Sequence, residues 1–249
     1  MHIKKYIPYT SVFAFIAVLF STQEVYAMHI MEGFLPPMWA ALWFAVSVPF
    51  IWMGIRSIKK ISDENSSIKM LLGLCGAFAF VLSSLKLPSV TGSCSHPTGV
   101  GLGAILFGPA ASSVMALVVL LFQALLLAHG GLTTLGANVF SMGIAGPITS
   151  FVLYKTMNKM GTSKAVSVFV ATACGNLVTY IVTSIQLGIA FPGEVGMIAA
   201  IGKFMGIFAL TQVPLAISEG LLTVVIYNLL ASYHKNELNQ LNLLRGEKA

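Results

Sequence analysis

A histidine just after an apparent export signal could bind a transition metal in this sequence. Val25-Tyr26-Ala27 carries small or tolerated residues at the positions that a signal peptidase reads, and His29 follows two residues later. If cleavage occurs after Ala27, Met28 gains a free amine, while His29 offers its amide nitrogen and its imidazole. These three nitrogens can close chelate rings around one ion, and coplanar nitrogen ligands suit Ni(II), Co(II) or Cu(II). Without cleavage the amine is absent, and His29 is then an ordinary polar residue beyond the signal.

The fourth corner of such a plane needs another neutral nitrogen, and His96 is the candidate. It lies in a polar, glycine-containing loop over residues 89–99, so its imidazole could complete a set of four nitrogen ligands. Cys94 is a rival ligand, but a thiolate favours softer ions and would release them less readily. His129 precedes two glycines, where it either has a structural role or supports a ligand imidazole by hydrogen bonding.

Composition places these residues in a membrane protein. Of the 249 residues, 57% are hydrophobic and only 9% are charged, and the mean hydropathy is +0.87. Such a chain is expected to be an all-α integral membrane protein. The formal net charge of +6 comes from basic residues in short clusters between apolar runs. That pattern is typical of orientation signals rather than of nucleic-acid binding.

Three regions are expected along the chain. Residues 1–27 begin with a pair of lysines before a short apolar run, and they are expected to form a cleavable signal peptide. An uncleaved first transmembrane helix is the alternative, although Pro8 and the shortness of the run argue against a full span. Residues 28–234 are expected to form a transmembrane metal-binding domain, and residues 235–249 a cytoplasmic polar tail.

The apolar runs predict about seven membrane segments after removal of the signal. A break at Gly108-Pro109 splits one over-long run into a short helix and a full span, which keeps the later lysines on the inner side. The last region is expected to cross once, with a lip around Lys203 before a span that begins near Gln212. The positive-inside rule then places the three histidines discussed above on the outer side. The expected segments cover residues 38–55, 70–87, 101–107, 110–128, 137–157, 165–190 and 195–231.

No enzyme signature accompanies this pattern. The nearest approach to a nucleotide-binding loop, residues 196–203, has the wrong glycine spacing and lacks the Ser or Thr that would hold magnesium. The sequence also lacks a His-Glu-x-x-His pair and a Gly-x-Ser-x-Gly elbow. An intramembrane enzyme or a scaffold with a structural metal would need a titratable pair that the sequence does not offer. Glu219, in a late apolar segment, has either a structural hydrogen bond or a role in transport.

Three segments of the sequence resemble the CbiM/NikM family, the substrate-binding (S) membrane components of energy-coupling factor (ECF) importers for cobalt and nickel. They cover residues 28–36, 129–138 and 211–220, within a likeness that runs from Met28 to about Ala231. The resemblance implies an ECF S-component-like bundle of about seven helices with an extra N-terminal segment.

The resemblance also implies a set of ligands. The metal would be held by the amine of Met28, the amide and imidazole of His29, and the imidazole of His96. Asn138 and His129 are candidates for supporting the site. Because the amide must lose its proton to bind, affinity for the metal is expected to fall as the pH drops.

The implied role is substrate capture for an ECF-type ABC importer of Co(II), with no permanently bound cofactor. Capture would occur on the outer face of the bacterial cytoplasmic membrane, with the mature N-terminus outside and the C-terminus in the cytoplasm. The implied partners are a CbiQ-like membrane coupling component, a CbiO-like cytoplasmic ATPase pair and a CbiN-like small accessory protein. The chain itself would be a transport component, not an enzyme. Ni(II) in the same role and a stand-alone metal transporter are the alternatives.

Overall fold

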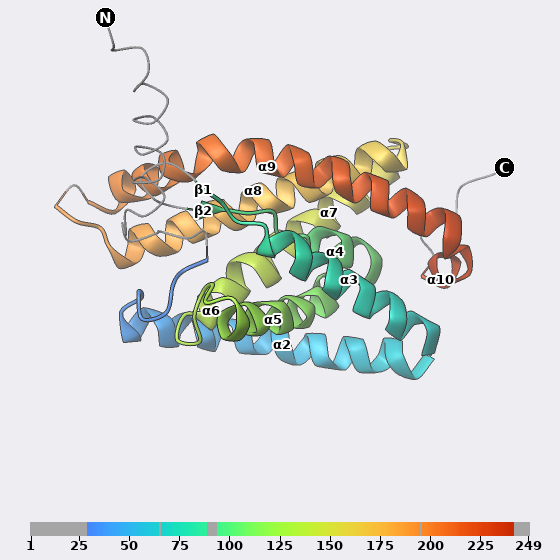
Figure 1. Cartoon of the computed structure of the whole chain (residues 1–249), viewed down its shortest axis with the longest axis horizontal. Coiled ribbons are helices and arrows are strands. Elements are labelled where there is room, and N and C mark those ends of the chain that lie inside the picture. Colours follow the sequence, from blue (N-terminus) through green and yellow to red (C-terminus); the bar gives the residue numbers. More distant parts are fainter. Residues whose placement is uncertain (1–28, 65, 89–93, 195, 242–249) are drawn as a thin grey trace, which may run out of the picture.

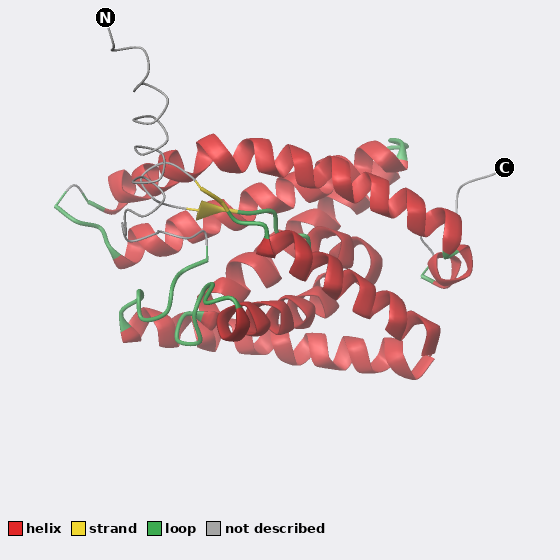
Figure 2. Cartoon of the chain, in the orientation of Figure 1, coloured by secondary structure: helices red, strands yellow, loops and turns green. Residues whose placement is uncertain are grey.

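The computed structural model describes residues 29–64, 66–88, 94–194 and 196–241. Helices make up most of these ranges, and one short two-stranded ladder is the exception among them (Figure 2). The expected all-α fold is therefore confirmed. The expected signal peptide, Met28 and the end of the polar tail lie outside the described residues.

The described elements follow the order expected from the apolar runs (Figure 1). The ladder pairs β1 (Leu87–Pro88) with β2 (Cys94–Ser95) in antiparallel register, so that Leu87 lies opposite Ser95. The helices are α2 (Pro37–Glu64), α3 (Ser66–Ser84), α4 (Val100–Phe107), α5 (Pro109–Leu126), α6 (Leu135–Asn138), the π-helix η3 (Val139–Ala145), α7 (Gly146–Lys159), α8 (Lys164–Ala190), α9 (Met197–Tyr233) and α10 (Lys235–Gln240).

Within the described residues, five helical segments are long and apolar enough to cross a membrane. Two further apolar segments are shorter: Ile68–Ser84 within α3, and α4. Each of the membrane segments expected from the sequence therefore has a helical counterpart. The five long segments are Pro37–Asp63, Pro109–Leu126, Leu135–Lys159, Lys164–Ala190 and Met197–Tyr233.

Two expectations about helix breaks have opposite outcomes. The break at Gly108-Pro109 is present: Gly108 has a φ of 85°, and Pro109 begins α5, where its missing amide hydrogen would have had no partner within the helix. The expected lip around Lys203 is wrong, because α9 continues as one helix through Lys203 and Pro214. Proline is tolerated in a membrane helix when surrounding groups satisfy the backbone carbonyl that it frees.

The two ends of the bundle differ in charge. The α2–α3 connection, the α7–α8 connection and the end of α9 lie at one end, whereas the start of α2, the α5–α6 loop and the α8–α9 connection lie at the other (Figure 1). The first end carries the basic clusters near the ends of α2, α3, α7 and α8. Their lysines are Lys59, Lys60, Lys69, Lys155, Lys159 and Lys164.

Helix α4 forms the centre of the packing. All of its eight residues are buried, and it contacts α3, α5, α7 and α8. Helix α2 lies at the outside and exposes large apolar side chains such as Met38, Trp52 and Ile55. An exposed apolar surface of this kind is what a helix in contact with lipid requires.

Gly136 sets the distance between α6 and α2. A Cβ atom on Gly136 would lie 2.5 Å from both the Cα and the backbone nitrogen of Phe44, which is closer than non-bonded atoms can approach. Ser47 uses the same close approach, because its hydroxyl donates to the carbonyl oxygen of Gly136 at 2.8 Å. Helix α6 therefore packs directly on the backbone of α2.

Replacing Gly136 with Ala is expected to destabilise the protein by about 1–3 kcal/mol, because the added methyl group pushes α6 away from α2. The measurement is the midpoint of thermal unfolding of the purified protein in detergent. Gly202→Ala is the matched control, since Gly202 is exposed near the start of α9 and a Cβ there would meet no atom within 4 Å. Equal midpoints for the two variants would contradict the close packing.

Candidate metal centre

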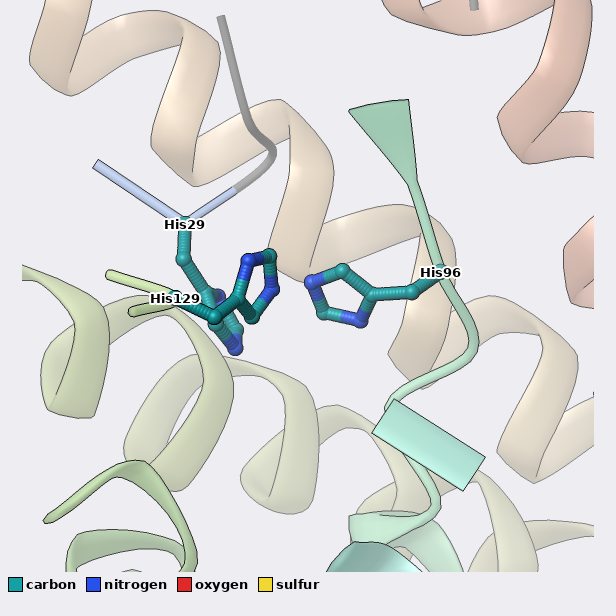
Figure 3. A group of neighbouring side chains, drawn as sticks. All are labelled: His29, His96 and His129. Carbon is teal, nitrogen blue, oxygen red and sulfur yellow. The ribbon is translucent and has the colours of Figure 1, made fainter. Parts of the chain in front are cut away.

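Three histidine side chains meet in one cluster: His29 precedes α2, His96 follows β2 and His129 lies in the α5–α6 loop (Figure 3). One nitrogen from each of His29, His96 and His129 lies within 4.8 Å of the others. The ring centroids are 4.3 Å apart for His29 and His96, 4.7 Å for His29 and His129, and 4.9 Å for His96 and His129. All three side chains are at most 3% exposed. Three imidazoles from distant parts of the chain can therefore reach one ion.

The His96 ring is oriented by its own backbone. Its Nδ1 lies 2.8 Å from the carbonyl oxygen of Pro97, so Nδ1 carries the hydrogen and donates it. Nε2 then has the lone pair, and this atom is buried without a hydrogen-bond partner in the described part of the chain. The ring points towards His29 and His129 from the opposite side of the cluster (Figure 3).

Glu219 of α9 fixes the chain that follows His96. Its carboxylate accepts hydrogen bonds from the Thr98 amide at 2.6 Å, the Thr98 hydroxyl at 2.9 Å and the Gly99 amide at 2.8 Å. These donors lie at the start of α4, where a negative charge is favourable. Gly99 has a φ of 69° and packs on the backbone of Ala79. Of the two roles considered for Glu219, the hydrogen-bonding role is therefore the one observed.

Two amide side chains extend this support. Gln212 of α9 donates from Nε2 to the carbonyl oxygen of His96 at 3.2 Å and to Oδ1 of Asn176 at 2.6 Å. Asn176 of α8 in turn donates to Glu219 at 2.5 Å. Ser95 and Thr211 also share a hydrogen bond of 2.7 Å between their hydroxyls. The His96 loop is thus held by α8 and α9.

Gln123 of α5 determines which nitrogen of His29 carries hydrogen. The Ser83 hydroxyl donates to the carbonyl oxygen of Ala79 at 2.5 Å, so it must accept the 2.6 Å hydrogen bond from Nε2 of Gln123. The remaining amide atom of Gln123, Oε1, lies 3.2 Å from Nε2 of His29. Because an amide oxygen can only accept, His29 donates from Nε2, and its Nδ1 keeps the lone pair.

Asn138 and Thr134 hold the segment that follows His29. Asn138, at the end of α6, accepts from the Ile30 amide at 2.8 Å and donates to the Ile30 carbonyl oxygen at 3.0 Å. The Thr134 hydroxyl donates to the same carbonyl oxygen at 2.6 Å. The backbone of Ile30 is thus fully paired by side chains, as buried polar groups require.

Glu32 makes a second connection to the α5–α6 loop. Its carboxylate accepts hydrogen bonds from the Thr133 side chain and from the amides of Thr133 and Leu132, and these hydrogen bonds lower the pKa of Glu32. The Thr133 hydroxyl accepts from the Gly33 amide at 3.0 Å. Gly131 permits this approach, because a Cβ on it would lie 2.4 Å from the Cα of Glu32.

The backbone around His129 has an unusual conformation. Ala128 has a φ of 46°, a value that non-glycine residues rarely adopt, and Gly130 has a φ of 74°. The His129 amide donates to the carbonyl oxygen of Gln123 at 3.1 Å. Nε2 of His129, like that of His96, is buried without a hydrogen-bond partner among the described residues. Backbone strain of this kind is often found at functional sites.

Burial keeps all three imidazoles neutral at pH 7. Loss of hydration lowers the pKa of His29 well below its usual value, and the nearby His96 and His129 lower it further. Burial likewise lowers the pKa of His96 to about 4 and that of His129 to about 2. Neutral imidazoles have a free lone pair, which is the form that binds a metal ion.

The structure brings together some of the predicted residues and not others. His29, His96 and His129 share one cluster, and Asn138 holds the residue next to His29. Met28 lies outside the described residues, so the structure does not describe its amine. Cys94 is buried in β2, but it is not part of the cluster that the described residues form.

Sequence reasoning missed the polar side chains that orient the histidines. Gln123, Asn176 and Gln212 all lie inside apolar membrane segments and are buried. A polar residue in such a segment is costly unless it is paired, which is the signal that could have identified them. Thr134 had no such signal, because it lies in a loop.

Comparison with known proteins agrees with a metal-binding membrane bundle. Residues 29–237 match the family model CbiM, described as "Cobalt uptake substrate-specific transmembrane region". The chain is 56% identical over 240 residues to the cobalt transport protein CbiM of Moorella thermoacetica, covering 96% of this chain and 93% of that protein. It is 60% identical over 225 residues to the CbiM of Chlorobium limicola, covering 90% and 89%.

A solved structure shares the fold. The crystal structure of a truncated transition metal transporter superimposes with a TM-score of 0.72 at 27% sequence identity, covering 83% of this chain and 100% of that one. A second transition metal transporter gives a TM-score of 0.70 at 25% identity, covering 83% of this chain and 94% of that one. The family match, the identity over nearly the whole length and the shared fold together show that this chain belongs to the CbiM family.

Proposed function

We propose that this chain captures Co(II) on the outer face of the bacterial cytoplasmic membrane, as the substrate-binding component of an ECF-type importer. One observation carries the proposal: three buried, neutral imidazoles converge, and two of them have an Nε2 atom without a partner. A buried nitrogen without a partner is costly, so its position calls for a ligand. The name cobalt transport protein, given to relatives at 56–60% identity, supports cobalt as the ion.

The ion would be held by four nitrogens in one plane. After cleavage behind Ala27, the Met28 amine and the His29 amide nitrogen close a five-membered chelate ring. The same amide nitrogen and Nδ1 of His29 close a six-membered ring, which Nε2 could not do. The hydrogen bond from His29 to Gln123 supports this assignment, because it leaves Nδ1 as the nitrogen with the lone pair. Nε2 of His96 would take the fourth position.

The charge difference between the two ends of the bundle supports an outward-facing site. Lysine clusters gather at the α2–α3 and α7–α8 connections, and cytoplasmic connections are the ones enriched in basic residues. His29 precedes α2 and His129 lies in the α5–α6 loop, and both the start of α2 and this loop lie at the opposite end (Figure 1). This arrangement supports a metal centre that faces outward and a polar tail in the cytoplasm.

Release would be driven by partner proteins. The sequence has no nucleotide-binding loop, so a CbiQ-like coupling component and a CbiO-like ATPase pair would supply the work, with a CbiN-like accessory protein. Ni(II) is the second candidate for the cargo, because it also accepts four planar nitrogens. The solved structures with this fold, which are named transition metal transporters, favour neither ion.

Blocking signal cleavage is expected to abolish tight Co(II) binding while all three histidines remain. Ala27→Leu places a large residue before the cut and leaves the Met28 nitrogen in a peptide bond. Metal analysis and mass spectrometry of the purified protein measure the retained cobalt and the mature N-terminus together. His96→Ala should lose cobalt without changing the N-terminus, whereas His234→Ala, at the far end of α9, should behave as wild type. Normal cobalt retention by the uncut chain would refute the amine ligand.

Replacing Gln123 with Leu is expected to weaken Co(II) binding by roughly 10- to 100-fold, because His29 loses the acceptor that fixes its tautomer. Gln123→Glu keeps an acceptor facing Nε2 and should retain most of the affinity. The measurement is titration of the metal-free protein with Co(II), with the unfolding midpoint as a check on folding. Equal affinities for the two variants would show that the hydrogen bond does not orient the ligand.

Co(II) uptake into cells is expected to require the partner ATPase. Cells that express the chain with the coupling component and the ATPase pair should accumulate radioactive cobalt, and a variant ATPase that cannot hydrolyse ATP should remove this uptake. A stand-alone transporter would instead give the same uptake with the chain alone.

A further inference from the structure

The four-nitrogen plane leaves one nearby nitrogen unused. Nε2 of His129 is buried and has no hydrogen-bond partner among the described residues, yet a ligand nitrogen of His129 lies within 4.8 Å of those of His29 and His96. A side chain that only supported a ligand would donate to it or accept from it, as Gln123 does for His29. No hydrogen bond joins His129 to either of the other two histidine side chains in the described structure.

We propose that Nε2 of His129 is a fifth ligand, which binds the captured ion from above the four-nitrogen plane and favours Co(II) over Ni(II). This inference rests on the proposed function. If Met28, His29 and His96 fill the plane, any further nitrogen can reach the ion only along the axis perpendicular to it. The position of His129, on a loop separate from the other two histidines, is consistent with such an approach (Figure 3).

The loop that carries His129 is built to deliver it to the centre. Ala128 has a φ of 46°, a conformation that costs free energy and is retained only where the surroundings impose it. Two contacts impose it here. The His129 amide donates to the Gln123 carbonyl oxygen, and the next residue, Gly130, lies close to His29 and Asn138. A Cβ on Gly130 would be 3.2 Å from the Asn138 amide nitrogen and 3.5 Å from the His29 Cβ.

A fifth nitrogen would discriminate between the two candidate ions. Four coplanar nitrogens that include a deprotonated amide give a strong ligand field, in which Ni(II) is stable as a planar ion without axial ligands. Co(II), with one electron fewer, binds an axial nitrogen readily in the same field. His129 would therefore add binding free energy for Co(II) and little for Ni(II), which is selectivity by a difference of affinities.

The electron paramagnetic resonance spectrum of the cleaved, Co(II)-loaded protein tests this geometry directly. Low-spin Co(II) has its unpaired electron along the axis, so one axial ¹⁴N ligand splits each cobalt line into a triplet. Protein grown with ring-¹⁵N histidine should give doublets instead, which identifies the ligand as an imidazole. The measurement is made in buffer without imidazole or other amines. A wild-type low-spin spectrum without nitrogen splitting would overturn the fifth ligand and leave the four-nitrogen site intact.

Variants of His129 then assign the nitrogen to this residue. His129→Ala and His129→Gln should lose the triplet, bind Co(II) about tenfold more weakly or worse, and bind Ni(II) as wild type does. His234→Ala is the control for loss of a histidine outside the centre. A triplet that persists in both His129 variants would overturn the assignment.

Two outcomes separate this inference from the proposed function. A high-spin, four-coordinate Co(II) spectrum would mean that three imidazoles bind without the amide, and it would overturn both the axial ligand and the planar site. Failure of the cleaved wild-type chain to bind Co(II) at all would refute the proposed function, and the fifth ligand with it.

Discussion

Two buried imidazole nitrogens without partners are the constraint on which the rest of the site depends. Each such atom, on His96 and His129, costs about 1–3 kcal/mol relative to a paired one. Rotation would cost the His96 ring its hydrogen bond from Nδ1 to the Pro97 carbonyl oxygen, and the backbone of His129 is fixed by the hydrogen bond from its amide to the Gln123 carbonyl oxygen. This cost lowers the stability of the protein. Because burial also keeps both rings neutral, each ring keeps a lone pair that is available to a metal ion.

Separate hydrogen-bond networks offset that cost and set the positions of the ligands. Gln123 and Ser83 fix the His29 tautomer, and Asn138 with Thr134 holds the backbone just beyond it. Glu219, Asn176 and Gln212 fix the His96 loop from the other side. Nearly every polar group in these networks is buried and paired, so the protein itself holds the candidate ligands in place. Such preorganisation reduces the entropy lost on binding.

The sequence predicted the helices and the convergence of the histidines better than the means of holding them. Apolar run length and lysine position were enough to separate α4 from α5 at Gly108 and to expect His29, His96 and His129 on one side of the membrane, and the three side chains do meet. The lip at Lys203 failed, because hydropathy carries no information on whether a helix continues through a polar residue and a proline. The pairing of Gln123 with His29 spans 94 residues, and no local pattern encodes a contact of that range.

The ligands are supported by two different sets of helices, and this division bears on how a buried ion could leave. His29 and His129 are tied to α5 and α6, through Gln123 and Asn138, whereas the His96 loop is tied to α8 and α9. The hydrogen bonds named here lie within one set or the other, and one further hydrogen bond, from Nε2 of Gln186 in α8 to the Ala137 carbonyl oxygen in α6 at 3.1 Å, joins the two sets. A displacement of one set relative to the other would break the Gln186–Ala137 hydrogen bond and separate the nitrogens, but it would leave both networks intact. Under the proposed function, the ion would join the two sets, and a shift of one set relative to the other would open a route for its release.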